Sequence, residues 1–154
     1  MSDTVTDVTI SVRAATEVND DLVESFSRLI PQLSSSSPAP TSAELLSIID
    51  NPNSALFIAE VETDGERSVV GSLTLAFYRI PTGLKAWIED VVVDESARGL
   101  GVGEALNLAA IDEARQRGAK NVSLTSRSSR EAANRLYQRL GFEPYETNLY
   151  RFGL

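Results

Sequence analysis

The sequence predicts an α+β fold built on a mixed, mostly antiparallel sheet. Segments with the two-residue period of strands and segments with the helical period follow the order β-α-α-β-β-β-α-β-α-β. Turn signals join three consecutive strands directly, which indicates an antiparallel meander. The later strands are separated by helices, which is typical of βα crossovers. The two kinds of connection together predict a sheet of mixed direction.

The first third of the chain is expected to hold one strand and two helices. Apolar residues alternate over 8–13, the pattern of a strand. Asn19 can cap a helix whose apolar stripe runs over 22–30, and Pro31 is expected to end that helix. A serine-rich loop over 32–40 leads to the second helix, which is short.

Two capping boxes predict helix starts. In such a box a Ser or Thr side chain accepts from a backbone N–H three residues later, and a Glu there accepts in return. Thr41 with Glu44 opens the second helix. Ser128 with Glu131 opens the last helix, which is expected to end at Gly141.

Five apolar or β-branched runs between turn signals complete the predicted sheet. They cover 55–62, 68–78, 86–93, 121–125 and 142–152. Asp64-Gly65 is expected to form the turn of a hairpin, and Pro81-Thr82-Gly83 the next turn. A helix follows the strand 86–93 and is expected to end near Arg117, with Gly118 as its stop.

Composition narrows the function. A chain of 154 residues is expected to form one domain, 1–154. The net charge of −8 argues against nucleic-acid binding, and no run approaches 18 apolar residues, so no membrane span is expected. The first residues lack the features of a signal peptide, which favours a cytoplasmic protein. The chain has no cysteine and no histidine, so no metal site and no thiol nucleophile are expected.

Acidic residues are concentrated in the first part of the chain. Residues 1–66 hold 12 acidic and 2 basic side chains, whereas residues 67–154 hold 10 acidic and 12 basic ones. This distribution suits an anionic cofactor bound by the second part and a cationic amine that approaches the first. Ordinary solvated charge is the alternative interpretation.

A glycine-rich loop between a strand and a helix is the strongest functional signal. Gly99, Gly101 and Gly103 alternate directly after Arg98. Small residues at a helix N-terminus let backbone N–H groups approach an anion, and the helix dipole adds to the attraction. A dinucleotide fingerprint fails because the third glycine comes one residue early, and a P-loop fails because Glu104 follows the last glycine. The loop therefore predicts an anion cradle, most simply for phosphate.

The pattern Arg-x-x-Gly-x-Gly of this loop resembles the coenzyme A pyrophosphate loop of the GNAT family of N-acetyltransferases. The family's order of elements also matches nearly the whole chain. The resemblance implies a three-layer fold with helices on both faces of the sheet, acetyl-CoA as cosubstrate, and frequent homodimers. It also implies cofactor contacts from Arg98, Gly99, Leu100, Gly101, Val102 and Gly103.

The segment 133–142 is similar to a second family motif, Ala-x-x-Leu-Tyr-x-x-x-Gly-Phe. In the family this tyrosine, here Tyr137, commonly protonates the leaving thiolate, and a phenol with a pKa near ~10 suits that role. A tyrosine that packs into the core is the alternative. Arg130 stands where many members have an asparagine that contacts pantetheine. Either Arg130 contacts the cofactor differently, or Asn134 replaces the contact, or the contact is absent.

Glu89 and Asp90 interrupt an otherwise apolar strand. Adjacent strand residues face opposite sides, so both carboxylates share a face only if the strand carries a bulge. The family has such a bulge, and the resemblance implies that Val91, Val92 and Val93 line the pantetheine arm. Backbone groups of Val91 and Val93 would pair with its amides, and an N–H near Val91 would polarise the thioester carbonyl.

A carboxylate in this strand is the expected general base. Glu89, or in second place Asp90, would accept the proton of a substrate ammonium directly or through water, as a buried carboxylate with a raised pKa can. A salt bridge between Glu89 and an arginine is the structural alternative. Arg127, after the short strand, could bind an anionic group of the substrate or simply be solvated.

These observations lead to one main hypothesis, an acetyl-CoA-dependent N-acetyltransferase. A primary amine of a small-molecule or peptide acceptor would attack the thioester directly, because the chain offers no thiol nucleophile. A coenzyme A-binding sensor without turnover and an interaction module that keeps only the fold are the rivals. The identity of the amine and the choice of acetyl or another acyl donor stay open.

Overall fold

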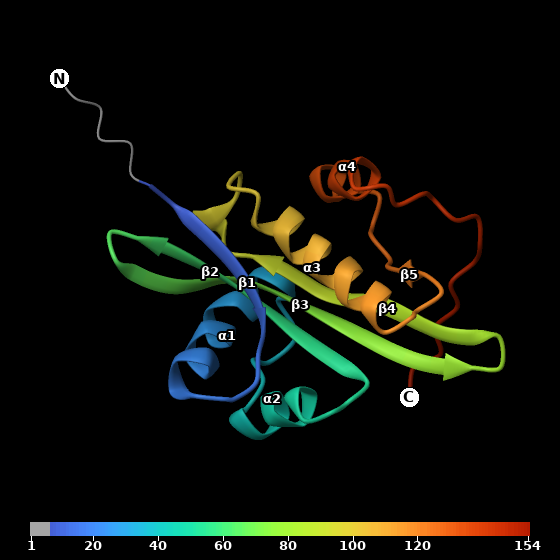
Figure 1. Ribbon diagram of the computed structural model, residues 1–154, viewed down its shortest axis with the longest axis horizontal. Helices are drawn as coiled ribbons and strands as arrows, with labels where there is room; N and C mark the ends of the chain where they lie inside the picture. The colour runs from blue at the N-terminus through green and yellow to red at the C-terminus, as the bar shows by residue number, and fades with distance from the viewer. Residues whose placement is uncertain (1–6) are drawn as a thin grey trace. The chain divides into compact units, whose positions relative to one another are not determined.

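The computed structural model describes residues 7–154, and the chain divides into two compact units, one ending at Leu124 and the other covering Thr125–Leu154 (Figure 1). The first unit holds β1 (Thr9–Ala14), α1 (Asp20–Leu33), α2 (Ser42–Ile49), β2 (Ser54–Thr63), β3 (Glu66–Ile80), β4 (Gly83–Val93), α3 (Val102–Gln116) and β5 (Val122–Ser123). The second unit holds α4 (Glu131–Arg139). The single domain expected over 1–154 stays a prediction.

The five strands form one sheet in the order β1-β2-β3-β4-β5. Neighbouring strands run antiparallel except β4 and β5, which are parallel. The β2–β3 hairpin turns at Asp64 and Gly65, whose φ angles of 51° and 80° are the positive values that a tight two-residue turn needs. The mixed, mostly antiparallel sheet predicted from the sequence is confirmed.

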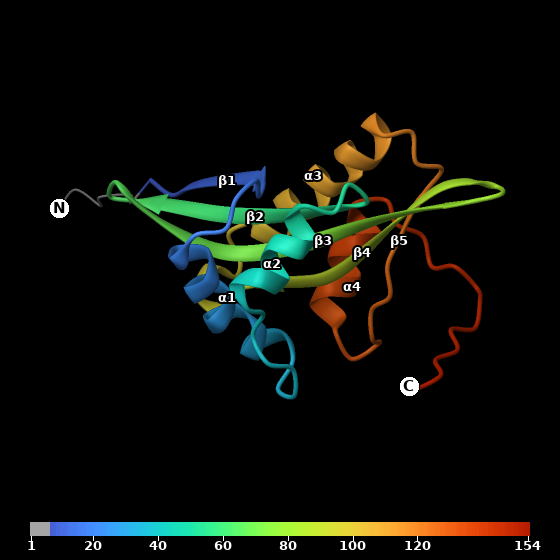
Figure 2. The ribbon, with the colours of Figure 1, turned by 90° about the horizontal axis from the view of Figure 1, so that it is seen from below.

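Helices cover both faces of this sheet, with α1 and α2 on one face and α3 on the other (Figure 2). Gly71 on β3 marks the α3 face, because a Cβ atom there would meet Val102 Cγ1 at 3.0 Å and Leu106 Cδ1 at 3.2 Å. Strand side chains alternate between faces, so Leu73 and Leu75, both fully buried, lie on this face too. The predicted three-layer arrangement is confirmed.

A hydrophobic cluster fills the space between the sheet and the first two helices. Its buried members are Ala15, Leu22, Phe26, Leu29, Leu45, Leu56, Ile58, Val69 and Val92. Both helices begin as the sequence predicts. Asn19 Oδ1 accepts from the Leu22 N–H at 2.8 Å. The Thr41 hydroxyl and the Glu44 carboxylate each accept from the other's backbone N–H, at 3.2 and 3.1 Å.

The expectation that Pro31 ends the first helix is wrong, because α1 continues to Leu33. A proline lacks one backbone N–H, which costs a single helical bond when the residue lies in the last turn. The turn still closes, since the Ser34 N–H donates to the Ile30 carbonyl at 2.9 Å. Gln32 is therefore a helical residue and not part of the loop.

In the second unit, two local predictions are wrong. Arg130, not Ser128, is the N-cap of α4, and no side chain of the described residues caps this helix. The Arg130 N–H donates to the Arg127 carbonyl at 3.0 Å, and this turn leaves Ser128 outside the helix start.

The strand expected over 142–152 is also absent from the described chain, and β5 is shorter than predicted. Pro144 offers no N–H to a ladder. The large apolar side chains of this segment stay exposed instead of covering a sheet: Tyr145, Leu149, Tyr150 and Phe152.

The close approach of α3 to β3 gives a testable prediction. In Gly71→Ala the new methyl group would lie 3.0 Å from both Val102 Cγ1 and the Val92 carbonyl oxygen, so the helix and the strand must move apart. We expect the free energy of unfolding in urea to fall by about 1–3 kcal/mol. Gly153→Ala is the control, because a Cβ atom there meets no described atom within 4 Å. Equal stability of the two variants would contradict the tight contact.

Candidate functional site

A bulge interrupts β4 at its two acidic residues. Thr74 of β3 pairs with Glu89, but Ser72 pairs with Val92, so two residues of β4 stand opposite one residue of β3. Asp90 has a φ of 51°, in the left-handed region that residues other than glycine rarely adopt. The extra residue bends the strand and leaves part of its ladder unpaired. The bulge implied by the family resemblance is present.

The outer edge of β4 is largely unpaired. This strand pairs with β5 only at Ala86 and Trp87, opposite Val122 and Ser123. No other strand of the described chain pairs with this edge farther along. From the bulge to the end of β4, the edge is therefore open to an extended ligand.

The backbone direction after the bulge follows from one hydrogen bond. The Asp94 N–H donates to the Val70 carbonyl on β3 at 2.7 Å. Backbone groups of successive strand residues alternate in direction, so those of Val92 also point to β3, whereas those of Val93 point to the unpaired edge. The side chain of Val92 is buried in the core. The contact with the cofactor predicted for Val92 is therefore not supported by its orientation.

Both carboxylates at the bulge are exposed to solvent. Glu89 and Asp90 are thus both exposed, although Glu89 lies in a strand whose neighbouring residues Ala86 and Ile88 are buried. The buried environment expected for Glu89 is therefore wrong. Of the ion pairs formed within residues 7–154, none includes Glu89, so the alternative of a structural salt bridge is not observed.

The glycine loop starts directly after β4. A short 3₁₀ turn over Glu95–Ala97 leads into it, and Gly101 is the N-cap of α3. Gly99 and Gly101 have φ angles of 81° and 85°, which side chains would strain. A Cβ atom on either would meet no described atom within 4 Å, so the space beside the loop is open.

The N-terminus of α3 faces this open space without a side-chain cap from the described residues, because glycine holds the N-cap position. The buried Val102 side chain anchors the first turn, so only its backbone can meet a ligand. Gly103 adds no side chain, and Arg98 and Leu100 are exposed on the loop. Backbone N–H groups and the positive end of the helix dipole are therefore available to an anion here.

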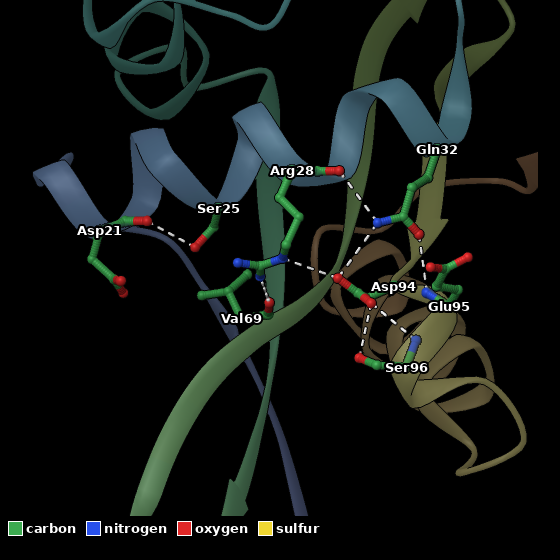
Figure 3. A network of polar contacts seen from close by, with 8 residues as sticks. All are labelled: Asp21, Ser25, Arg28, Gln32, Val69, Asp94, Glu95 and Ser96. Atoms are coloured by element: carbon green, nitrogen blue, oxygen red, sulfur yellow. Dashed lines mark hydrogen bonds and ion pairs between the residues drawn. The ribbon is translucent and has the colours of Figure 1, made fainter.

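A buried aspartate fixes the start of this loop (Figure 3). Asp94 Oδ1 accepts from the Ser96 N–H at 2.9 Å and from the Ser96 hydroxyl at 2.8 Å. Its Oδ2 accepts from Arg28 Nε at 3.0 Å and from Gln32 Nε2 at 3.4 Å, both on α1. Arg28 also donates to the Val69 carbonyl. The carboxylate therefore joins α1, the sheet and the loop.

These contacts lower the pKa of Asp94 from 3.8 to about 2. The largest cause is the hydrogen bond from the Ser96 backbone N–H, which favours the ionised form. Burial acts in the opposite direction, and the Ser96 hydroxyl, Arg28 and Gln32 add further stabilisation of the charge. Asp94 is therefore an ionised anchor at every pH at which the protein is expected to work.

The second unit holds the other predicted residues. Tyr137 is 7% exposed, and its ring meets Phe142 edge-to-face at a centroid distance of 5.8 Å. Burial raises the pKa of Tyr137, and the positive charge of Arg130 opposes the shift. Asn134 Nδ2 donates to the Arg127 carbonyl at 2.9 Å, which engages one end of its amide within the unit.

Comparison with protein families shows to which family the chain belongs. A model of the acetyltransferase (GNAT) family matches residues 17–142. The chain belongs to this family. The matched region includes the bulge of β4, the glycine loop and Tyr137.

Individual relatives of this GNAT chain agree with the assignment. N-alpha-acetyltransferase 30 of Schizosaccharomyces pombe is 36% identical over 73 residues, which make up 47% of this chain and 48% of that protein. The chain thus spans about half the length of this relative. A solved acetyltransferase from Trypanosoma brucei is 28% identical, with a TM-score of 0.72 and coverage of 96% and 100% of the two chains. An aminoglycoside N-acetyltransferase solved with CoA is 19% identical, with a TM-score of 0.74 and 99% coverage of both chains, and shows the fold alone.

Sequence reasoning missed the network around Asp94. The signal was an aspartate at the end of a β-branched strand with a serine two residues later, a pattern typical of an Asx turn. Nothing local points to Arg28 and Gln32, which lie more than sixty residues earlier in the chain.

Residues 7–154 contain neither a metal-binding cluster nor a helix that could span a membrane. No group of three or more acidic side chains there is arranged to hold a metal ion. No helix in that part of the chain is both long and apolar enough to cross a membrane.

The lowered pKa of Asp94 predicts a pH-dependent contribution to stability. A carboxylate with a folded-state pKa near 2 and an unfolded-state pKa of 3.8 stabilises the fold by about 2 kcal/mol above roughly pH 5. Asp94→Asn should lose this amount at pH 7. Its difference from the wild type should shrink as the pH falls through about 4 to 2, since the wild type then loses the same charge.

Urea unfolding at several pH values measures this difference. Asp112→Asn, on the exposed side of α3, is the control and should change the free energy of unfolding at pH 7 by less than about 0.5 kcal/mol. A gap between wild type and Asp94→Asn that stays constant from pH 7 to pH 2 would show that the charge of Asp94 contributes nothing.

Proposed function

We propose that the chain is an acetyl-CoA-dependent N-acetyltransferase that acts on a primary amine. The observation that carries the proposal is the continuity of two features: an open strand edge after a bulge, and a glycine loop that opens α3. An extended arm can pair with the edge while the pyrophosphate attached to it meets the helix N-terminus. Acetyl-CoA has this shape and charge.

The glycine loop is proposed to hold the pyrophosphate. Backbone N–H groups at Gly101, Val102 and Gly103 would donate to its oxygens, and the exposed Arg98 would add a positive charge. The positive φ of Gly99 lets the loop turn with no side chain in the open space. Leu100 would cover the edge of the cofactor.

The edge of β4 is proposed to bind the pantetheine arm as an added strand. Val93 is assigned this role because its backbone groups point away from β3. Val91, which lies in the bulge, is assigned it from the family resemblance. The Val91 N–H would also donate to the thioester carbonyl oxygen, where negative charge develops when the amine attacks.

Glu89 is proposed to accept the proton of the substrate ammonium, with Asp90 in second place. The exposure of both carboxylates favours transfer through water, since solvent reaches them. The nitrogen of the free amine then attacks the carbonyl carbon and loses its second proton to water, the carbon–sulfur bond breaks, and the thiolate leaves. Tyr137 is proposed to give its phenolic proton to that thiolate. The raised pKa of Tyr137 keeps the phenol protonated near neutral pH.

The acceptor is proposed to be a small-molecule or peptide amine. One similar protein is named for N-alpha-acetylation and another for acetylation of aminoglycosides. Acceptors of both kinds therefore occur among the proteins that this chain resembles. The two exposed carboxylates at the bulge favour a cationic acceptor of either class. Arg130 and Asn134 are proposed to contact the cofactor, because their segment resembles the family motif.

Thermal unfolding with acetyl-CoA tests the cofactor site. At 100 times its Kd the ligand should stabilise the wild type by about 2.7 kcal/mol, a Tm increase of about 5–10 °C. Gly101→Glu should abolish this increase, because the new carboxylate occupies the anion site and repels phosphate. Gly65→Glu is the matched control: it has a similar φ of 80°, the same open space, and lies in the β2–β3 turn. No increase for the wild type would refute the cofactor, and an increase for Gly101→Glu would refute the assigned loop.

Turnover of Tyr137→Phe on an amine panel tests the proposed acid. Loss of a general acid should lower kcat by about 10²- to 10⁴-fold and leave the Kd for acetyl-CoA within about threefold. Tyr145→Phe, at an exposed position, is the control and should behave as the wild type. An unchanged kcat in Tyr137→Phe would remove the acid role. Binding of acetyl-CoA by the wild type with no turnover of any amine would favour a coenzyme A sensor.

A further inference from the structure

The last turn of α1 reaches the residues that start the glycine loop (Figure 3). Gln32 Oε1 accepts from the Glu95 backbone N–H at 2.9 Å, and Gln32 Nε2 donates to Asp94 Oδ2 at 3.4 Å and to the Arg28 carbonyl at 3.2 Å. One amide thus holds two consecutive residues of the loop entrance and ties them to its own helix. The contact joins positions 63 residues apart in sequence.

The Gln32 contact acts on the Glu95 peptide, at the entrance to the glycine loop. Asp94 is already fixed by Ser96 and by Arg28, whereas within residues 7–154 the Glu95 N–H donates to Gln32 alone. Beyond this point the chain crosses open space at Gly99 and Gly101, where glycine adds flexibility. The direction in which the loop leaves β4 therefore depends on the Glu95 peptide.

Arg28 has a different structural role, although it lies one helical turn before Gln32. Its guanidinium bridges Asp94 and the Val69 carbonyl at the edge of the hydrophobic cluster. Its loss would disturb the packing of α1 on the sheet as well as the loop. Gln32 is half-buried and all its partners are polar groups that water can replace, so its loss should spare the core.

We propose that Gln32 is a positioning residue for the proposed coenzyme A site, which sets the geometry of the pyrophosphate loop through the Glu95 peptide and Asp94. The proposal rests on the proposed function of that loop. Gln32 touches neither the cofactor nor the reacting atoms. It keeps the loop in the binding geometry before the ligand arrives, so its removal lowers the fraction of competent protein and weakens the apparent affinity.

Calorimetric titration with CoA tests this role. Gln32→Met keeps the length of the side chain and removes its hydrogen bonds, and should raise the Kd for CoA about fivefold. Gln32→Glu keeps an acceptor for the Glu95 N–H but adds a negative charge beside Asp94, and should raise the Kd by about tenfold or more. The unfolding midpoint of the ligand-free protein should stay close to that of the wild type in Gln32→Met. A role in folding alone would lower the midpoint and leave the Kd unchanged.

Gln116→Met is the matched control. Gln116 Nε2 also donates to a carboxylate, Asp112 Oδ2 at 2.8 Å, but at the opposite end of α3 from the loop. Its Kd for CoA should equal that of the wild type. If Gln32→Met binds CoA within twofold of Gln116→Met, the positioning role is refuted while the cofactor site stands. If the wild type itself binds no CoA, the proposed function fails first and this inference falls with it.

Discussion

The single extra residue in β4 is the constraint on which the rest of the candidate site depends. Without it, strict alternation would place Glu89 and Asp90 on opposite faces of the sheet. Asp90 takes the left-handed conformation at the bulge, both carboxylates are exposed, and the strand edge beyond them is free of β5. A strained residue and unpaired backbone groups both lower the stability of the fold. Such features persist where they serve binding.

The other half of the candidate site, the glycine loop and the start of α3, is held from the α3 face of the sheet. Gly71 lets α3 lie so close to β3 that Val102, the first residue of the helix, is buried against it. The helix N-terminus is therefore fixed in space, while the loop before it stays open. Asp94 and α1 fix the other end of this loop from the first face. Helices of two different layers thus hold one short segment that neither could order alone.

Local patterns predicted much of this molecule. The alternation of strands, the Asp64-Gly65 turn and the Thr41–Glu44 box each follow from a few neighbouring residues, and each is confirmed. Glu89 and Asp90 were recognisable because two charges break an apolar run. Their exposure was not, since the burial of a bulged residue depends on which way the chain turns there. The same limit applies to Ser128, whose capping pattern is intact but whose position is shifted by a turn at Arg127. Pro31 predicts that Gln32 belongs to a loop, yet α1 continues two residues farther, to Leu33.

The ionisable groups of the site constrain how turnover should depend on pH. The chain has no histidine, the pKa of Asp94 is lowered to about 2, and burial raises the pKa of Tyr137 above its usual 10.0. Both groups therefore keep one protonation state between about pH 5 and 9, so the loop geometry and the proposed proton donor stay constant there. A change of rate within that range must come from the acceptor ammonium or from the group that takes its proton. Because Glu89 and Asp90 are exposed, water can carry that proton. The ionisation of the attacking amine then becomes the main cause of the pH dependence of the rate. A series of acceptor amines that differ in pKa should then shift the rate profile with them.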